Sequence, residues 1–215
     1  MGRSSRFASF LLLLLGGCAS APAPQASLSL NQEGAEAYRR GDLGAARAAF
    51  GKAMQSNNPE SLAINALSLA RVEQAAGDSE AAHRALDAVL ATSVGSPLRA
   101  EAAGRKALLY LAAGDLRQAG EWQGRALALC ERCRAQGAIV NIGARIALAA
   151  GDPSLASQLA ERVLKLPASD DARPEQANAQ RILAEAAAMA AAAQPPSFSQ
   201  PVARPTVGTP KEAVR

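Results

Sequence analysis

The sequence has few aromatic residues: one Trp, two Tyr and four Phe make up 3% of its 215 residues. Lys and Arg are more numerous, but no run of them is interleaved with aromatic side chains. Surfaces that bind nucleic acids combine clustered basic residues with such side chains. We therefore expect no nucleic-acid partner.

Histidine is scarcer still, because His83 is the only one. A single imidazole without a recognisable partner predicts neither a metal site nor a base–nucleophile pair. The sequence also lacks a nucleophile elbow, a glycine-rich phosphate loop and a His-Glu helix motif. We expect His83 to lie in solvent or at a rim, and we expect no enzyme, no cofactor, no metal and no small-molecule substrate.

The chain begins with a short basic and apolar stretch. Arg3 and Arg6 precede a nine-residue apolar run from Phe7 to Leu15. This run is too short to span a bilayer as a helix and is typical of a signal peptide. We therefore assign residues 1–17 to a signal peptide.

The apolar run continues into Leu15-Gly16-Gly17-Cys18. This tetrapeptide resembles the lipobox of bacterial lipoproteins, with Leu at −3, small residues at −2 and −1, and then cysteine. The resemblance implies cleavage before Cys18, a diacylglyceryl thioether on its sulfur and an acylated α-amine, and such chains anchor stably when there are two or more. An Asp after the cysteine commonly retains these lipoproteins in the inner membrane, so Ala19 implies the outer membrane. An ordinary secretory signal with an unrelated cysteine is the alternative.

Two flanks are expected to be flexible. We predict that residues 18–29 form a tether. Five prolines in residues 194–215 predict a disordered tail, and a polyproline-like docking segment is the alternative. Signal removal takes away Arg3 and Arg6 and lowers the formal net charge from +4 to +2. Residues 30–193 remain for one helical domain.

Four Gly-Asp dipeptides recur in this domain at spacings of 36, 37 and 37 residues: Gly41-Asp42, Gly77-Asp78, Gly114-Asp115 and Gly151-Asp152. Each glycine suits the left-handed position that ends a helix, and each aspartate suits the N-cap of the next helix. A fixed period of this length is typical of stacked helical hairpins.

We predict four hairpins and a last helix that caps the array. The predicted helices are Leu30–Arg40 and Leu43–Gln55, Ser61–Ala76 and Ser79–Ala91, Leu98–Ala113 and Leu116–Leu129, Ala135–Ala150 and Pro153–Leu166, and Pro174–Ala193.

The hairpins resemble the tetratricopeptide repeat (TPR) family, in which small and large residues recur at fixed places around such a turn. The matching residues are Gly34, Ala46, Phe50, Ala53 and Pro59; Ala70, Ala82, Leu86 and Val89; Ala107, Ala119, Gln123 and Ala126; and Ala144, Ala156, Ala160 and Val163. The resemblance implies an all-α, right-handed α-solenoid of about four TPR-like hairpins plus a C-terminal capping helix. The period exceeds the family's 34 residues, and Gln123 stands at a packing position, where Trp122 beside it can compensate.

In TPR arrays the first helix of each hairpin lines a concave wall, and the Gly-Asp turns set its register. On that wall we expect Tyr38, Arg39, Arg71, Gln74, Glu101, Asn141 and Arg145, with Leu108, Leu111 and Leu148 beside them. Arg71 and Arg145 occupy equivalent positions two repeats apart and can together grip a carboxylate, such as a C-terminus or an acidic peptide. Ordinary solvated charge is the alternative.

Cys130 and Cys133 are the only thiols left if Cys18 is lipidated. An even count in an oxidising compartment favours a local disulfide. Redox CxxC pairs normally begin a helix, whereas this pair is predicted at a helix end, which disfavours the thiolate. Reduced cysteines and a redox or metal function remain alternatives.

These features predict a membrane-anchored scaffold or adaptor at the periplasmic face of the outer membrane. Its partners would be proteins or peptides of envelope assembly: pilus or secretion machines, outer-membrane assembly, or the recruitment of peptidoglycan enzymes. A thiol–disulfide accessory protein and a chaperone-like peptide-binding solenoid are the alternatives.

Overall fold

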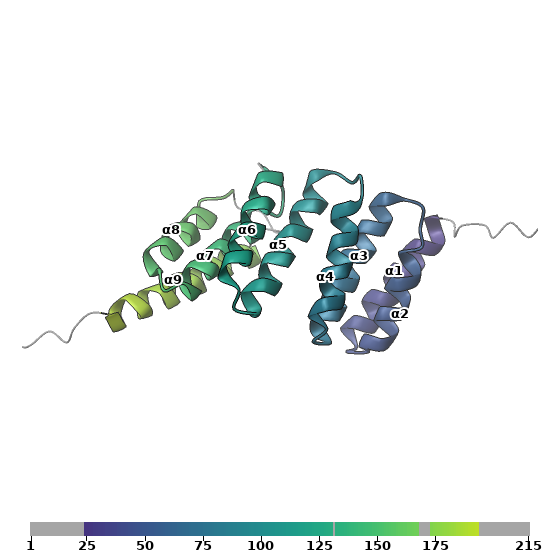
Figure 1. Cartoon of the computed structure of the whole chain (residues 1–215), viewed down its shortest axis with the longest axis horizontal. Coiled ribbons are helices and arrows are strands. Elements are labelled where there is room, and N and C mark those ends of the chain that lie inside the picture. The colour runs from purple at the N-terminus through teal and green to yellow at the C-terminus, as the bar shows by residue number, and fades with distance from the viewer. Residues whose placement is uncertain (1–23, 131, 168–172, 194–215) are drawn as a thin grey trace, which may run out of the picture.

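The computed structural model describes residues 24–130, 132–167 and 173–193, which form nine helices and no strand (Figure 1). The helices follow one another along the long axis of the molecule as sequential hairpins. They are α1 (Pro24–Arg39), α2 (Leu43–Ala53), α3 (Pro59–Ala75), α4 (Ser79–Ala91), α5 (Ser96–Ala112), α6 (Leu116–Leu129), α7 (Gln136–Ala149), α8 (Pro153–Leu164) and α9 (Arg173–Ala193). The predicted all-α array of hairpins with a terminal helix is thus confirmed.

Most helix ends lie within two residues of their predicted positions, and the exception is the start of α1. This helix begins at Pro24 rather than at Leu30, so residues 24–29 of the predicted tether are helical. Proline is well tolerated in the first turn of a helix, and no later proline interrupts the segment. The signal peptide, Cys18, Ala19 and the proline-rich tail lie outside the described residues.

The Gly-Asp turns have the backbone geometry that their sequence predicts. Their glycines have φ values of 79°, 80°, 78° and 79°, in the region that disfavours residues with a side chain. Each following aspartate accepts a hydrogen bond from the backbone N–H three residues later, at 2.8 to 2.9 Å. The same local device therefore ends one helix and begins the next in all four hairpins.

The helices divide into two layers with different spacing. Helices α1, α3, α5 and α7, which we call the A helices, contact one another in sequence, and α9 joins their row against α7 and α8. Within the described ranges, no two of the B helices (α2, α4, α6 and α8) make contact. A stack that is closer on one side curves toward that side, so the A helices line the concave face.

The core is a chain of four small clusters instead of one large one. The clusters join α1–α3, α3–α5, α5–α7 and α7–α9, so each shares a helix with the next. Alanine supplies much of the buried surface. Two glycines bring the last helices especially close: a Cβ at Gly104 of α5 would lie 3.4 Å from Ile142, and one at Gly137 of α7 would lie 3.3 Å from Glu175 of α9.

Candidate binding site on the concave face

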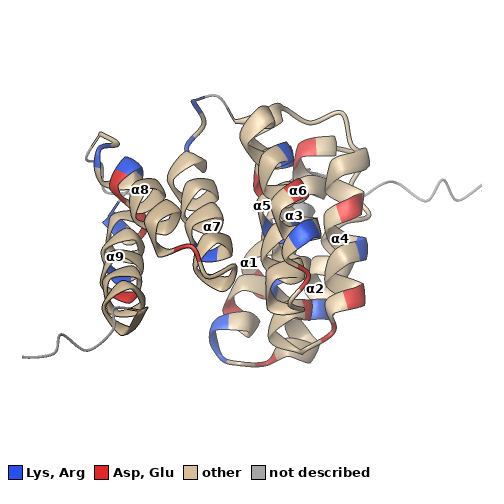
Figure 2. Ribbon diagram, turned by 60° about the vertical axis from the view of Figure 1, so that its left-hand side comes forward, with Lys and Arg blue, Asp and Glu red and all other residues tan. Residues whose placement is uncertain are grey.

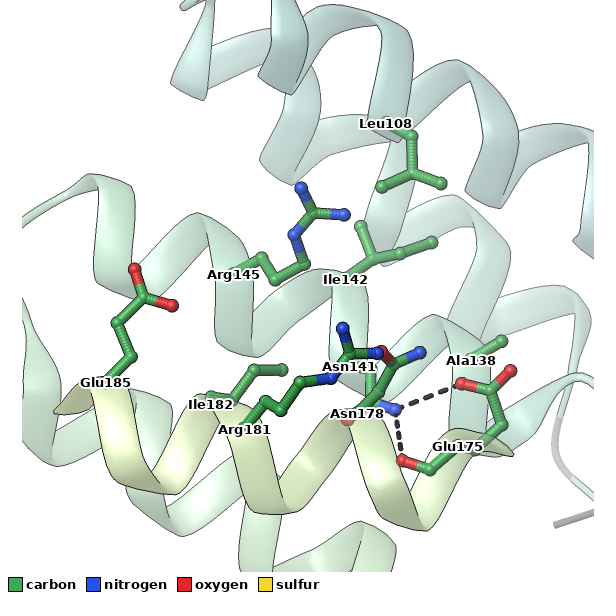
Figure 3. Close-up of a pocket in the computed structure, with 10 residues that line it drawn as sticks. All are labelled: Leu108, Ala138, Asn141, Ile142, Arg145, Glu175, Asn178, Arg181, Ile182 and Glu185. Atoms are coloured by element: carbon green, nitrogen blue, oxygen red, sulfur yellow. Dashed lines mark hydrogen bonds between the residues drawn. The ribbon is translucent and has the colours of Figure 1, made fainter. Parts of the chain in front are cut away.

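The concave face is hollowed where α5, α7 and α9 meet, and the cavity has a volume of about 480 Å³ (Figure 3). This volume lies within the range of roughly 300–1,000 Å³ that is typical of ligand pockets. Its apolar lining consists of Leu108, Ala138, Ile142 and Ile182. Its polar lining consists of Asn141, Arg145, Glu175, Asn178, Arg181 and Glu185. We call this cavity the C-terminal pocket.

Helix periodicity places the polar residues on facing sides of the pocket. Asn141 and Arg145 are four residues apart on α7 and therefore lie on one face of that helix. The α9 residues Glu175, Asn178, Arg181 and Glu185 follow at intervals of three or four and line the opposite wall (Figure 3). Gly137, one turn before Asn141, allows α9 to approach α7 at this point.

Asn141 is buried in the wall of the pocket, with only 4% of its surface exposed. Its Nδ2 donates hydrogen bonds to the backbone oxygen of Glu175 at 2.8 Å and to Oε2 of the same residue at 3.0 Å (Figure 3). Both partners are acceptors, so the amide must present its nitrogen to Glu175 and its oxygen elsewhere. That oxygen, Oδ1, is buried and accepts no hydrogen bond from the described residues.

Two of the four charged residues of the pocket have no partner among the described residues. Arg145 and Glu185 are exposed, and neither forms a hydrogen bond or ion pair with another residue in the described ranges. Arg181 donates a hydrogen bond to Asn178 on its own helix. Elsewhere, Lys and Arg lie among Asp and Glu over much of the fold (Figure 2). The local arrangement in this pocket, instead of a general surface charge, therefore determines what it can bind.

Three of the predicted concave residues meet in a second, smaller cavity of about 220 Å³ between α1, α2 and α3. We call it the N-terminal pocket, and it is lined by Ala35, Tyr38, Arg39, Phe50, Ser68 and Arg71. Arg71 forms no hydrogen bond or ion pair within the described part of the chain.

The remaining predicted residues do not share one site. Gln74 is exposed near the end of α3, and Glu101 accepts a hydrogen bond at 2.7 Å from Arg105 on its own helix. Leu148 is buried in the α7–α9 core cluster and is not part of the exposed wall, in contrast to the prediction. Leu111 is half-buried, whereas Leu108 does line the C-terminal pocket.

The structure does not bring Arg71 and Arg145 together in one pocket. These residues line separate pockets on α3 and α7, which are two A-helix steps, or roughly 20 Å, apart. Arg181, and not Arg71, lines the same pocket as Arg145. The register of α9 could not be predicted from a Gly-Asp turn, because none precedes that helix.

Cys130 and Cys133 form a disulfide, with an S–S distance of 1.97 Å. Cys130 follows the C-terminal end of α6 and is buried in the α5–α7 cluster. Cys133 precedes Ala135, the N-cap of α7, by two residues, so neither cysteine stands in the first turn of a helix, where the pKa of reactive thiols is lowered. The described residues contain no group of three or more His, Cys, Asp or Glu that could hold a metal ion. None of the described helices is both long and apolar enough to cross a membrane.

His83 lies on α4 in a cluster away from the concave pockets. Its ring centroid is 4.7 Å from that of Tyr110, and its Nδ1 is buried without a hydrogen bond to a described residue. Burial lowers the pKa of His83, and the nearby ammonium of Lys106 lowers it further, while Asp87 acts in the opposite direction. His83 is thus a half-buried packing residue rather than a fully solvated one.

Acidification is expected to destabilise the fold through His83. The pKa of His83 in the folded state is below its unfolded value of about 6.5, so the unfolded chain binds a proton first as the pH falls. Stability should be fully retained above about pH 6.5 and should decline as the pH falls from there toward the folded-state pKa. Thermal unfolding of the wild type and His83→Gln between pH 8 and 5 measures this effect. The variant should lose part of the pH dependence; identical slopes would contradict the prediction.

Comparisons with known proteins agree with the fold described above. No family model matches the chain, and no curated protein matches it. Among solved structures, it is similar to a tetratricopeptide repeat protein from Parabacteroides merdae, with 17% identity over 77% of this chain and a TM-score of 0.53. This match spans 64% of the Parabacteroides merdae chain.

Two further structures have the same type of array. The MamA protein is 14% identical, with 78% of this chain and 93% of that chain covered and a TM-score of 0.51. The TPR-like repeats of a kinesin light chain from Podosopora anserina are 20% identical, with coverages of 80% and 99% and a TM-score of 0.54.

The structure and these matches therefore define an all-α repeat fold. More specifically, the chain has a TPR-like fold, in which the helices pack as sequential hairpins.

Proposed function

We propose that this protein is a lipid-anchored adaptor that binds partner proteins at the periplasmic face of a bacterial outer membrane. The observation that carries the binding role is the concave face, which has a pocket near each end. Each pocket contains an arginine with no partner in the described ranges, Arg71 in one and Arg145 in the other. Exposed guanidinium groups beside apolar lining suit polar groups of another polypeptide.

The anchor is proposed from Leu15-Gly16-Gly17-Cys18 and Ala19. Acyl chains on Cys18 would confine the solenoid to one surface and raise the effective concentration of any protein that it holds there. This arrangement suits recruitment to an envelope machine, such as one for pilus assembly, secretion, outer-membrane assembly or peptidoglycan remodelling.

The anchor is tested by palmitate labelling and membrane fractionation. The wild type is expected to incorporate label and remain with the outer membrane, whereas Cys18→Ser should lose the label and leave the membrane fraction. The double variant Cys130→Ser/Cys133→Ser controls for cysteine loss and should keep the label. Equal labelling of the wild type and Cys18→Ser would rule out the anchor.

The binding face is tested by photocrosslinking in cells. A crosslinker replacing Arg71 or Arg145 should capture the partner, whereas one replacing the exposed Arg84 of the B helix α4 should not. Capture from position 84 but from neither concave position would place the interface elsewhere. This measurement does not depend on the lipid, so the two parts of the proposal can fail separately.

A further inference from the structure

Helices α1 and α3 each present one row of side chains to the groove between them. The row on α1 is Leu28, Asn31, Ala35 and Tyr38, and the row on α3 is Ser61, Ile64, Ser68 and Arg71. Residues three or four apart lie on one face of a helix, so each row follows the length of its helix. The groove therefore joins two cavities end to end. One is the N-terminal pocket, and the other, nearer the N-terminal ends of both helices, has a volume of about 450 Å³.

The larger cavity, which we call the apolar cavity, is lined by two exposed aliphatic side chains. Leu28 is 67% exposed and Ile64 is 41% exposed. Between the two helices, Asn31 Nδ2 donates a hydrogen bond to Oδ1 of the buried Asn65 at 2.8 Å, so that this amide oxygen already has a donor. Leu28 and Ile64 are therefore the groups that gain most from being covered, and an apolar side chain would cover them.

The N-terminal pocket is lined by two cationic groups and, among the described residues, by no anionic one. Arg39 on α1 and Arg71 on α3 are both exposed. Arg39 donates one hydrogen bond, to the backbone oxygen of Ala35, and Arg71 has no partner in the described part of the chain. Packed helices lie about 8–10 Å apart, so these two long side chains can reach one carboxylate. It would accept charge-assisted hydrogen bonds from both guanidinium groups.

The acidic residues of α1 and α3 leave this pocket positive, because none of them lines it. Glu73 of α3 is 4% exposed and is paired with Arg47 of α2. Glu60 lines the apolar cavity, at the other end of the groove. An acidic ligand group is therefore attracted to the arginine end and repelled from the apolar end, which fixes the order of the two groups along the groove.

The distance between the two cavities is nearly the same along both helices. Seven residues separate Ile64 from Arg71 on α3, and seven separate Asn31 from Tyr38 on α1, which corresponds to a rise of about 10 Å. A polyproline II helix has three residues per turn and rises about 3.1 Å per residue. Its side chains at positions i and i+3 therefore lie on one face, about 9 Å apart.

We propose that the α1–α3 groove binds a segment of the partner polypeptide that carries an aliphatic side chain and, about 10 Å farther along, the side-chain carboxylate of an acidic residue. The aliphatic side chain covers Leu28 and Ile64, and the carboxylate lies between Arg39 and Arg71. This inference deepens the proposed adaptor function and rests on it for the source of the segment.

The test is calorimetric titration of the full-length mature protein with capped peptides in which prolines fix the spacing. Acetyl-Leu-Pro-Pro-Glu amide and the reversed acetyl-Glu-Pro-Pro-Leu amide carry both groups about 9 Å apart, and one of these two chain directions is expected to bind. In that direction, replacing Glu by Gln, replacing Leu by Ala, or removing both prolines should each weaken binding about tenfold, because one of the two cavities is then left unfilled.

Three results would overturn the inference. The first is failure of both chain directions to bind, and the second is equal binding of the Glu and Gln probes. The third is tighter binding of acetyl-Leu-Pro-Pro-Ala with a free C-terminus than of either Glu probe, which would assign the arginines to a polypeptide C-terminus instead of an acidic side chain.

Substitutions locate the two groups. Arg71→Ala should weaken the Glu probe about tenfold and leave the Gln probe unchanged, whereas Ile64→Ala should weaken both probes alike. Arg40→Ala is the matched control for charge, because Arg40 is exposed beside Arg39 on α1 but does not line the pocket. Leu155→Ala on α8 is the control for an exposed apolar residue. Equal losses in Arg71→Ala and Arg40→Ala would contradict the site.

This inference and the adaptor function can fail separately. Arg71 and Ile64 are exposed and belong to none of the four core clusters, so their variants should fold. A protein that captures its partner in cells but binds neither Glu probe would retain the adaptor function and lose this inference. Probe binding without capture in cells would retain the groove as a peptide site and remove the adaptor function.

Discussion

Replacing Leu86 by alanine is expected to lower the free energy of unfolding by about 2–5 kcal/mol. Leu86 is 1% exposed and lies in the cluster that joins α3, α4 and α5. Truncation removes its apolar contacts and leaves a cavity, because alanine neighbours such as Ala63 and Ala102 cannot extend into the space. Urea unfolding followed by circular dichroism measures the loss.

The position of Leu86 in a linear array adds a second expectation. Each hairpin is stabilised mainly by its neighbours, so weakening the second hairpin should separate the unfolding of the N-terminal helices from that of α7–α9. Hydrogen exchange should show faster exchange in α3 and α4 and little change in α8. Leu155→Ala is the control, since Leu155 is 44% exposed on α8. Equal destabilisation by the two substitutions would contradict this interpretation of the core.

The second large effect is expected from Asp87→Asn, which should destabilise the fold by about 1–3 kcal/mol. Lys106 is 6% exposed, and its ammonium donates a hydrogen bond to Asp87 Oδ1 at 2.5 Å across the α4–α5 interface. The same ammonium lies 4.3 Å from the ring centroid of Trp122 on α6. The substitution leaves a buried positive charge without its carboxylate, and the ring alone replaces only part of that interaction.

Removing the buried charge itself should be far less harmful. Lys106→Met keeps an apolar chain of similar length against Trp122 and avoids the desolvation of an ammonium, so we expect a change within about 1 kcal/mol of zero. The surface pair of Glu80 and Arg84 provides a control: Glu80→Gln should cost at most about 0.5 kcal/mol. Chemical denaturation of the three variants measures these changes in the free energy of unfolding. Equal losses in Asp87→Asn and Glu80→Gln would show that the buried pair contributes no more to stability than the surface pair.

The order of the helices was predictable because its signals are local. Gly41, Gly77, Gly114 and Gly151 each need only their own backbone conformation, and the following aspartates need only an N–H three residues away. The start of α1 lacked such a signal, because Pro24 is compatible both with a first helical turn and with an extended tether. Gln123 is an unusual residue at a packing position, and only the structure shows what it contacts. Its side chain packs against Gly143, where an added Cβ atom would lie only 2.9 Å from Gln123 Nε2.

The candidate site was predictable only in part. The repeat register brought Tyr38, Arg39 and Arg71 to one pocket and Arg145 to the other. The burial of Asn141 depends on where α9 packs, which no turn motif determined. The spacing of Glu175, Asn178, Arg181 and Glu185 by three or four residues is the signal that could have identified the α9 wall. Only the tertiary structure shows that these α9 residues face the concave side and line the pocket.

The early start of α1 limits how far the first helix can lie from the membrane if Cys18 carries the lipid. Only six peptide steps separate Cys18 from Pro24, so a chain held at Cys18 reaches at most about 20 Å before the first helix begins. Helices α1 and α9 lie at opposite ends of the long axis (Figure 1). If Cys18 is the anchor, the C-terminal pocket can lie farther from the membrane than the N-terminal pocket does. The length of the array would then hold partners bound at the two pockets at different distances from the membrane.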